Sequence, residues 1–238
     1  MQHPKISIII PVLNQKQMLE KALQSVFGQD FINYELIVID GGSEDGTFDV
    51  IQKYHHKISY YESTKDKNLY HAMNKAIDKS NGDWLYFMGA DDCLIENSLS
   101  TIFNNNLHAF EIVFGNIKYT DNTNYRSEFS KKLLLKNSLH HQATLYHKRC
   151  FYGKSFNTNY PILADYDFNL QLFFEQKKAL YLDTDFALCG REGISKQKGW
   201  PHYKEEFLIK KEQLNAVQFI VYGSLSLVKY LLNTIGLL

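Results

Sequence analysis

The stretch LIVIDGGSEDGT, Leu36–Thr47, decides the fold of this 238-residue chain. Its first four residues are an apolar run of the kind that forms a strand buried on both faces. Asp40 ends the run, two glycines then permit a sharp turn, and Asp45 or Thr47 can cap a helix that begins near Thr47. A carboxylate at the carboxyl end of a parallel strand is where open α/β sheets bind nucleotides. A turn without a ligand explains the stretch equally well, since the spacing is neither GxGxxG nor a Walker P-loop.

Outward from this stretch, about the first 100 residues alternate short apolar runs with apolar residues at helical spacing. This alternation predicts parallel βαβ units with right-handed crossovers. The expected strands are Ile6–Val12, Leu36–Asp40, Ile58–Tyr61 and Trp84–Met88, and the expected helices are Gln17–Phe27, Thr47–Tyr54, Leu69–Lys79 and Ser98–Asn105. We expect this half to hold a nucleotide.

The second half of the chain is less regular and α+β in style, and we expect it to build the pocket of a second substrate. Its expected elements are strands at 112–114 and 117–119 around Gly115-Asn116, a polar turn at 121–124, an extended segment at 140–147, a helix at 165–174 and a strand at 179–182. Neither a repeat nor a linker divides the chain. Residues 1–215 are therefore interpreted as one domain with halves at 1–105 and 106–215, followed by an apolar helical tail at 216–238.

Composition sets limits on partners and location. Lys plus Arg and Asp plus Glu balance at 26 each, so extended nucleic-acid binding is not expected. The three cysteines, Cys93, Cys150 and Cys189, are scattered, which favours reduced thiols in a cytosolic protein over a disulfide framework or a zinc ribbon. The N-terminal apolar run is too short for a signal peptide, so the chain is expected to begin in the cytoplasm.

Two adjacent carboxylates, Asp91 and Asp92, follow the apolar strand that ends at Met88. Like charges repel each other here unless a cation neutralises them. Mg²⁺ or Mn²⁺ would suit the pair, because hard divalent cations take one or two carboxylates together with substrate phosphates. The pair could instead cap the turn before the helix at Ser98. Asp40, at the end of another parallel strand, favours the metal–diphosphate interpretation.

Six motifs in this order resemble the family 2 glycosyltransferases with the GT-A fold, of the kind that builds bacterial surface polysaccharides. They are SIIIPVLN at 7–14, VIDGGSEDGT at 38–47, DKNLYHAMNKAI at 66–77, WLYFMGADD at 84–92, His141-Gln142 and ADYDFNL at 164–170. Each motif is weak alone, but the order and spacing are specific, and they extend to about Phe174. The resemblance implies a Rossmann-like, mostly parallel sheet flanked by helices, with an α+β acceptor half and C-terminal helices.

The resemblance also assigns roles by position. The nucleotide-sugar would be bound by Pro11, Asn14, Asp40, Gly41, Asp66, Asn74, Lys75, Ala90 and Asp91. Asp40 would grip the uracil-type base or the ribose, with Asp66 beside the base. Asp91, and more weakly Asp92, would bind the metal that bridges the diphosphate. His141 and Gln142 would line the acceptor side, where Asp165 would act as the general base.

Three positions depart from the pattern of the family. Gly89 stands at the first position of the DxD motif, so the metal site depends on the two acids that follow it. His71 replaces an Asp that relatives often carry, which could alter the choice of sugar. Ala164 replaces an acid next to Asp165.

Inverting transfer suits these residue types, because in-line displacement at the anomeric carbon needs a base for the acceptor and a cation for the leaving diphosphate. Asp165 and Asp167 are two residues apart, so on a helix only one of them should face the pocket. We expect Asp165 to be that residue. The alternative is that both acids only stabilise the helix N-terminus.

The histidines and the tail allow other interpretations. His140, His141 and His147 lack a further ligand at a zinc-site spacing, so zinc is not favoured, and His202 is either a late metal ligand or a solvated side chain. The segment 216–238 carries a single charge and is only marginally long enough to span a bilayer. We expect it to lie on the membrane surface, the alternative being packing on the domain or on a partner subunit.

The expected function is therefore inverting transfer of a sugar from a nucleotide-sugar, with UDP expected, to a lipid-linked bacterial glycan at the cytoplasmic face of the inner membrane. A nucleotidyltransferase would want glycines and basic residues after the first strand, where this chain has Asn14-Gln15-Lys16. A catalytically inactive binding module conflicts with the presence of Asp40, Asp91 and Asp165. The donor sugar, the acceptor, the linkage and the oligomeric state are not encoded in any motif.

Overall fold

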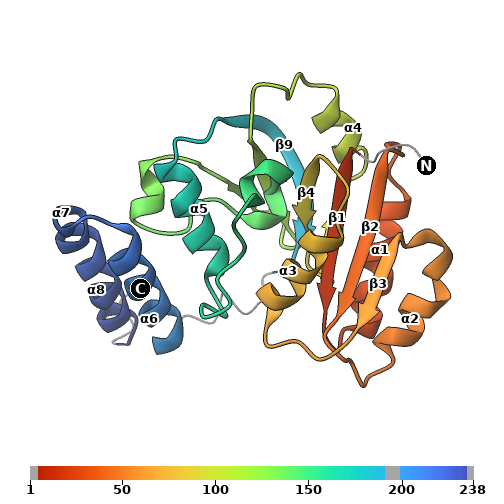
Figure 1. Ribbon diagram of the computed structural model, residues 1–238, viewed down its shortest axis with the longest axis horizontal. Helices are drawn as coiled ribbons and strands as arrows, with labels where there is room; N and C mark the ends of the chain where they lie inside the picture. The colour runs from red at the N-terminus through yellow and green to blue at the C-terminus, as the bar shows by residue number, and fades with distance from the viewer. Residues whose placement is uncertain (1–4, 191–198, 235–238) are drawn as a thin grey trace.

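The computed structural model describes residues 5–190 and 199–234. Its strands form one nine-stranded sheet in the order β3-β2-β1-β4-β8-β6-β9-β5, with β7 paired to β6 (Figure 1). The strands are β1 (Ile6–Val12), β2 (Tyr34–Asp40), β3 (Tyr60–Ser63), β4 (Trp84–Phe87), β5 (Cys93–Leu94), β6 (Ile112–Tyr119), β7 (Asn124–Arg126), β8 (Thr144–His147) and β9 (Ala179–Cys189). The helices are α1 (Lys16–Phe27), α2 (Thr47–Lys53), α3 (Leu69–Lys79), α4 (Ser98–Phe103), α5 (Ala164–Phe174), α6 (Trp200–Gln213), α7 (Ala216–Gln218) and α8 (Ser224–Thr234).

The strands β3, β2, β1 and β4 pair in parallel, so their carboxyl ends lie at one edge of the sheet. All seven residues of β1 are buried. Ile8 and Ile10 pack in one core with α1 and α2, whereas Ile9 packs in the other core with α3, because successive side chains of a strand point to opposite faces. Helices on both faces explain the continuous apolar runs of the sequence.

Two local features of this half concern the start of β3 and the start of α2. β3 begins two residues later than predicted, because a 3₁₀ turn at His55–Lys57 precedes it. At the start of α2, Asp45 Oδ1 accepts hydrogen bonds from the backbone N–H of Thr47 (2.9 Å) and from its hydroxyl (2.5 Å). Gly46 stands between them in the left-handed region, with φ +88°, which glycine adopts without strain.

The second half joins the sheet through β8, which runs antiparallel to β4 and to β6. The prediction of two strands at 112–114 and 117–119 is wrong, because β6 continues through Gly115. This glycine marks a close approach between strands rather than a turn. A Cβ there would lie 2.5 Å from both the carbonyl oxygen of Thr184 and the ring of Phe186 on β9.

Two other elements of this half also have unexpected lengths. The strand expected at 179–182 extends to Cys189, because β9 pairs in parallel along the whole of β6. The segment expected to be extended at 140–147 begins with a 3₁₀ turn at His141–Ala143, and only the residues of β8 pair in the sheet. This turn directly precedes β8, and its residues His141 and Gln142 line the cavity at the carboxyl ends of the parallel strands.

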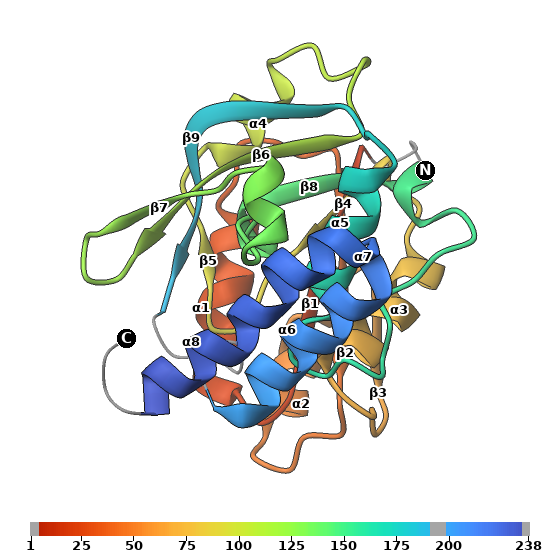
Figure 2. The ribbon, with the colours of Figure 1, turned by 90° about the vertical axis from the view of Figure 1, so that its left-hand side faces the viewer.

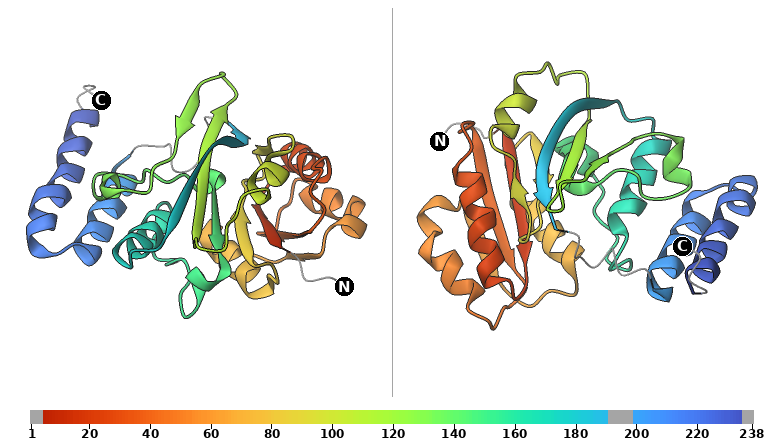
Figure 3. Two further views of the ribbon diagram at one scale, coloured as in Figure 1. Left: turned by 90° about the horizontal axis from the view of Figure 1, so that it is seen from above. Right: turned by 180° about the vertical axis from the view of Figure 1, so that it is seen from behind.

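The C-terminal helices stand at one end of the molecule, opposite α1 and α2 (Figures 2 and 3). α8 folds back along α6, and their facing sides enclose a polar cluster. Lys210 is fully buried and donates to Glu206 (2.6 Å) and to the carbonyl of Leu135 (3.1 Å), and Lys229 donates to the same two residues (2.8 and 2.6 Å). Among the described helices, none is long and apolar enough to cross a membrane.

Candidate active site

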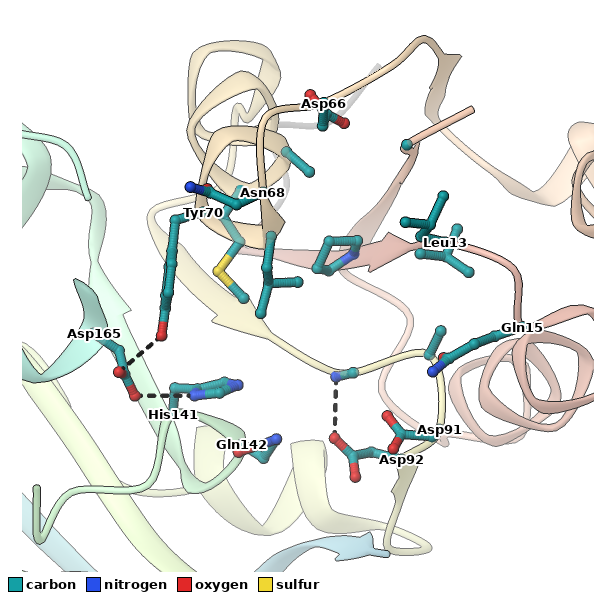
Figure 4. A pocket seen from close by; sticks show the side chains of 18 of the residues that line it. Leu13, Gln15, Asp66, Asn68, Tyr70, Asp91, Asp92, His141, Gln142 and Asp165 are labelled. Carbon is teal, nitrogen blue, oxygen red and sulfur yellow. Dashed lines mark hydrogen bonds and ion pairs between the residues drawn. The ribbon is translucent and has the colours of Figure 1, made fainter. Parts of the chain in front are cut away.

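A cavity of about 490 Å³ opens at the carboxyl ends of the parallel strands, between the two halves of the chain (Figure 4). The turns after β1, β2 and β4 form one side of it, the start of α3 forms another, and the 3₁₀ turn at 141–143 and the start of α5 close it. The sequence-predicted residues that line it are Pro11, Gly41, Asp66, Ala90, Asp91, Asp92, His141, Gln142 and Asp165. Four other predicted residues do not line it: Asn14, Asp40, Asn74 and Lys75.

Asp40 and Asn14 fasten the first two strand-to-helix turns together. Asp40 is fully buried and accepts hydrogen bonds from the N–H and the hydroxyl of Ser43 and from the hydroxyl of Ser63 (2.5 Å). Asn14 Oδ1 accepts from the N–H of Glu44 (2.9 Å), and the N–H of Asn14 donates to Ser43 (2.8 Å). A buried carboxylate needs hydrogen-bond donors nearby. Here the donors are Ser43, in the turn after β2, and Ser63, at the end of β3, and they hold in place the part of the wall that Gly41 forms.

Asp66 lies at the upper end of the cavity in Figure 4, and its two oxygens differ. Oδ1 is paired with Nδ1 of His71 (2.6 Å) and with Nζ of Lys75 (2.9 Å). Oδ2 is buried and has no hydrogen-bond partner among the residues that the structure describes. A buried acceptor without a donor is costly, so this oxygen is suited to a ligand that brings an N–H or O–H group.

Amide side chains of α3 and its N-cap hold the loop that closes the acceptor side. Asn74 donates to the carbonyl of Phe156 and accepts from its N–H, both at 2.9 Å. Asn68 donates to the carbonyl of Thr158 (2.9 Å). Asn74 therefore positions the wall of the cavity without lining it.

The acidic pair forms the lower end of the cavity. Asp91 is exposed, whereas Asp92 is buried and accepts a hydrogen bond from the N–H of Gly89 (3.1 Å). A Cβ at position 89 would lie 2.7 Å from both carboxylates, so both occupy the space that a side chain at 89 would take. Burial raises the pKa of Asp92, and the charge of Asp91 raises it further.

Asp165 forms the opposite end, at the start of α5, and is only 7% exposed. Oδ1 accepts from the hydroxyl of Tyr70 and the N–H of Tyr166, both at 2.9 Å. Oδ2 accepts from Asn137 (3.0 Å) and from Nδ1 of His141 (3.2 Å). Burial alone would raise the pKa of Asp165, but the hydrogen bonds and charge of His141, together with the Tyr70 bond, outweigh burial and lower it.

The 3₁₀ turn at 141–143 lies between the two acidic ends. His141 donates to Asp165, and the next residue, Gln142, whose Oε1 accepts from His140 (2.5 Å), lies close enough to Asp92 to lower the pKa of that carboxyl. Adjacent residues of one turn therefore lie next to two carboxylates that are 73 residues apart in the sequence.

The acidic pair offers few donors to a metal. The described residues contain no group of three or more His, Cys, Asp or Glu side chains that could hold an ion. Of the pair, Asp91 presents an exposed carboxylate to the cavity, whereas Asp92 is buried and accepts from the N–H of Gly89. One carboxylate fits a cation such as Mg²⁺ or Mn²⁺ only when substrate phosphates complete the coordination.

The other histidines do not form a zinc site with His141. His140 lines the cavity and bonds to Gln142, whereas His147 packs edge-on against Trp84 at the other end of β8, so the three rings do not converge on a point as a zinc site requires. His202 lies near the start of α6 and does not line the cavity.

Sequence reasoning missed three residues that shape the two ends. Tyr70 and Asn137 donate to Asp165, and Cys189 lies close enough to Asp92 to lower the pKa of that carboxyl. The helical spacing of apolar residues around Tyr70 predicts a core residue. Cys189 lies beyond 182, where the predicted strand ended. Asn137 lies in a segment without any recognisable pattern, so no signal in the sequence could have found it.

The chain matches a known protein family over most of its length. The family described as Glycosyl transferase family 2 matches residues 7–174. A PGL/p-HBAD biosynthesis glycosyltransferase of Mycobacterium bovis is 35% identical over 185 residues, which cover 73% of this chain and 71% of that protein. A GalNAc(5)-diNAcBac-PP-undecaprenol beta-1,3-glucosyltransferase of Campylobacter jejuni is 35% identical over 139 residues, covering 57% of this chain and 45% of that protein.

Two solved structures share the fold at low sequence identity. S. aureus TarS 1-349 in complex with UDP-GlcNAc has a TM-score of 0.69 at 18% identity and covers 95% of this chain and 71% of its own. The mannosyltransferase PcManGT from Pyrobaculum calidifontis, in complex with GDP-Man and Mn²⁺, has a TM-score of 0.63 at 15% identity and covers 95% of this chain and 64% of its own. The nucleotides of these two proteins differ, so the shared fold leaves the choice of base to local contacts.

Proposed function

The chain belongs to glycosyltransferase family 2 and has the GT-A fold, and on this basis we propose that it transfers a sugar, with inversion, from a UDP-sugar to a hydroxyl of a lipid-linked glycan. The cavity at the carboxyl ends of the parallel strands carries this proposal. It places an acidic pair at one end and a buried carboxylate–histidine pair at the other, with Asp66 at a third corner (Figure 4). A donor and an acceptor can thus meet between a site for a leaving diphosphate and a site for a proton.

Asp66 supports uracil as the base of the donor. Only its Oδ2 lacks a partner among the described residues, since His71 and Lys75 occupy Oδ1. Uracil presents a single N–H on its pairing edge, which one free oxygen can accept. Guanine presents two neighbouring donors on that edge, and a carboxylate pairs with them best through both of its oxygens. The turns fastened by Asn14 and Asp40 complete this end of the donor site.

The acidic pair supports a divalent cation, which GT-A glycosyltransferases typically use. We assign Asp91 as the protein ligand of Mg²⁺ or Mn²⁺, with Asp92 contributing its charge from behind while it holds Gly89. The cation, when bound with the donor, would neutralise the diphosphate as it leaves. Ala90 and Gly89 expose backbone at the same edge, so a diphosphate can approach closely.

The acceptor end supports an essential role for Asp165. Because its pKa is lowered, its carboxylate stays ionised at neutral pH, and we propose that removal of the proton from the acceptor hydroxyl depends on it. The acceptor is proposed to be a lipid-linked saccharide of bacterial surface-polysaccharide synthesis. A Campylobacter relative named for an undecaprenol-linked substrate supports this class.

The outer face of the C-terminal helices supports contact with a membrane surface. Exposed apolar side chains recur there at helical spacing: Val217, Ile220, Val221, Leu227, Val228 and Leu231. Lys229 points inward to Glu206, so this face carries no charge, whereas lysines at 131, 132 and 136 are exposed beside Leu135, whose carbonyl contacts α8. Apolar residues beside lysines suit an anionic bilayer, and we place the enzyme at the cytoplasmic face of the inner membrane.

Calorimetric binding of UDP tests the donor site, with GDP as comparator, with and without Mn²⁺. We expect UDP to bind more tightly than GDP, and Mn²⁺ to strengthen binding in the wild type. Asp91→Asn should lose at least about tenfold of the Mn²⁺-dependent affinity, roughly 1.4 kcal/mol, whereas Asp30→Asn, on an exposed loop, should not. Tighter GDP binding would overturn the choice of base, and absence of nucleotide binding under every condition would indicate an inactive relative of the family.

Co-sedimentation with lipid vesicles tests the membrane face. We expect the protein to bind vesicles that contain phosphatidylglycerol more strongly than vesicles of phosphatidylcholine alone. Ile220→Ser combined with Leu231→Ser should release it, whereas Ile32→Ser, at an 88% exposed position in the opposite half, should not. Unchanged sedimentation of the double variant, or self-association through this face in the absence of lipid, would contradict the proposal.

A further inference from the structure

We infer that His141, through its Nε2 atom, is the group that takes the proton of the acceptor hydroxyl, and that Asp165 is a positioning residue that acts through His141. This inference rests on the proposed transferase function and changes the assignment of Asp165 as the base. It follows from how each hydrogen-bonding position of the two side chains is used.

The carboxylate of Asp165 has no position left for the acceptor. A carboxylate offers about four lone-pair sites, and Asp165 receives four donors, two at each oxygen: Tyr70, Tyr166, Asn137 and His141. It is buried within α5 and its neighbours. Because the hydrogen bonds from His141 and Tyr70 also lower its pKa, the carboxylate is a weak base. To take a proton, Asp165 would have to break a bond with one of the four donors.

The imidazole of His141 has the complementary arrangement. Its Nδ1 donates to Asp165 at 3.2 Å, which places the proton of the neutral ring on Nδ1, because an ionised carboxylate only accepts. Nε2 is then an acceptor, and it makes no hydrogen bond with any part of the chain that the structure describes. In Figure 4 the ring points from Asp165 into the cavity. The pair therefore presents a single basic atom to the substrate.

The resulting step balances atoms and charges. A lone pair of the acceptor oxygen forms a bond to the anomeric carbon as the bond from that carbon to the diphosphate oxygen breaks, and its electron pair leaves with the diphosphate. The hydroxyl proton moves to Nε2, which gives an imidazolium that the negative charge of Asp165 stabilises. The proton is later released to solvent, so the neutral ring is restored for the next transfer.

A rival role for His141 is a contact with the diphosphate, since the ring also lies close enough to the acidic pair to lower the pKa of Asp92. In that role the ring would bind the nucleotide in the ground state, and its loss would weaken UDP affinity. A base acts only on the transfer step, so its loss lowers kcat and leaves UDP affinity unchanged. The two roles are therefore separated by one binding and one rate measurement.

The experiment compares wild type, His141→Gln, His141→Ala and the control His56→Gln, which lies in an exposed turn of the donor half. UDP affinity is measured with Mn²⁺ by calorimetry. UDP release is measured with UDP-GlcNAc, UDP-GalNAc, UDP-glucose and UDP-galactose, with water as acceptor, and repeated for His141→Ala with added imidazole. We expect both His141 variants to bind UDP within about twofold of wild type and to lose roughly 10²–10⁴-fold in kcat, with imidazole restoring at least tenfold to His141→Ala.

Each failure has a distinct signature. Wild type that neither binds UDP nor releases it from any of the donors would overturn the transferase proposal together with this inference. Active wild type with His141→Gln within about threefold of its kcat would overturn the inference alone and return the proton to Asp165. Weakened UDP binding in both His141 variants, or absence of rescue by imidazole in a variant that still binds UDP, would assign the ring to the diphosphate or to the structure of the site.

Discussion

The two acidic ends of the cavity are opposites in how their charges are satisfied. At the acceptor end, the pKa of Asp165 is lowered despite its burial, because the hydrogen bond and charge of His141 and the hydrogen bond from Tyr70 favour the ionised carboxylate. At the donor end, Asp92 has a raised pKa because it is buried next to the charge of Asp91. The surroundings of Asp165 therefore favour an ionised carboxylate, whereas the surroundings of Asp92 disfavour one.

The difference indicates what each end can bind. A carboxylate with every acceptor position filled cannot take a ligand of its own, but it can hold a neighbouring ring in one orientation. A pair of close carboxylates with one member exposed gains stability from any cation that arrives. The acceptor end is therefore organised in advance, whereas the donor end is completed by its ligand.

Removal of the charge at the organised end should have the largest effect. In Asp165→Asn, an amide NH₂ group replaces one carboxylate oxygen and faces groups that themselves donate hydrogen bonds. The ring of His141 therefore loses its orientation. We expect kcat for UDP release to fall about 10²–10⁴-fold, with UDP affinity unchanged. Asp30→Asn serves as the control, and a fall of less than tenfold would show that the four donors do not matter for the reaction.

Neutralising the buried member of the donor pair should have a smaller effect. Asp92→Asn keeps an oxygen for the N–H of Gly89 and leaves Asp91 as the exposed carboxylate. We expect the Mn²⁺-dependent UDP affinity to fall by a few-fold, less than the tenfold or more expected for Asp91→Asn. Calorimetry on the two variants ranks the carboxylates, and an equal or larger loss in Asp92→Asn would make Asp92 a direct metal ligand.

Filling the space between these carboxylates should be milder still. In Gly89→Ala the new Cβ would meet Asp91 and Asp92 at 2.7 Å, so both carboxylates must turn away. Asp92 is buried and yields less readily than Asp91. We expect UDP affinity with Mn²⁺ to fall by about twofold to fivefold and the cost of overpacking to be about 1 kcal/mol. A variant with unchanged affinity and thermal midpoint would mean that the acidic pair tolerates a side chain at 89.

The smallest effect is expected at Asp167, two residues from Asp165 on the same helix but facing away from the cavity. Burial raises its pKa, although Gln213 and Gln171 donate to it. Its contribution to stability is therefore present below the unfolded pKa of about 4 and is lost as the pH rises through the higher folded pKa. Asp167→Asn should raise the thermal midpoint at pH 7 by about 1–3 °C and leave it unchanged near pH 4, and a lower midpoint at pH 7 would contradict this.

Much of the donor half could be predicted from local patterns alone. A fully buried parallel strand must be apolar throughout, so 6–12 and 36–40 are recognisable without any knowledge of their neighbours. Parallel pairing then places all carboxyl ends at one edge, which correctly brings the turns at Gly41 and Asp91 to one cavity. The position of Asp66 follows as well, because it lies directly before α3 at that edge.

Elements held by long-range pairing were predicted less well. Gly115 resembles a turn residue, yet its role is to let β9 approach β6. The length of β9 depends on a partner strand 67–70 residues earlier in the sequence, and no local pattern records that partner. The same limit applies to Asn137 and Cys189, which approach Asp165 and Asp92 only because distant segments meet.

The sequence by itself determined the family and the fold class, because these depend on short motifs and on the periodicity of buried strands, and it predicted the acidic residues that line the cavity. The tertiary structure alone decided the surroundings of those residues. It buried Asp40 away from the lining, buried Asp92 next to the charge of Asp91, and gave Asp165 four hydrogen-bond donors. The reason is physical: a side chain fixes its own chemistry, but the number of donors around a carboxylate, and hence its pKa and role, is set by segments that only folding brings together.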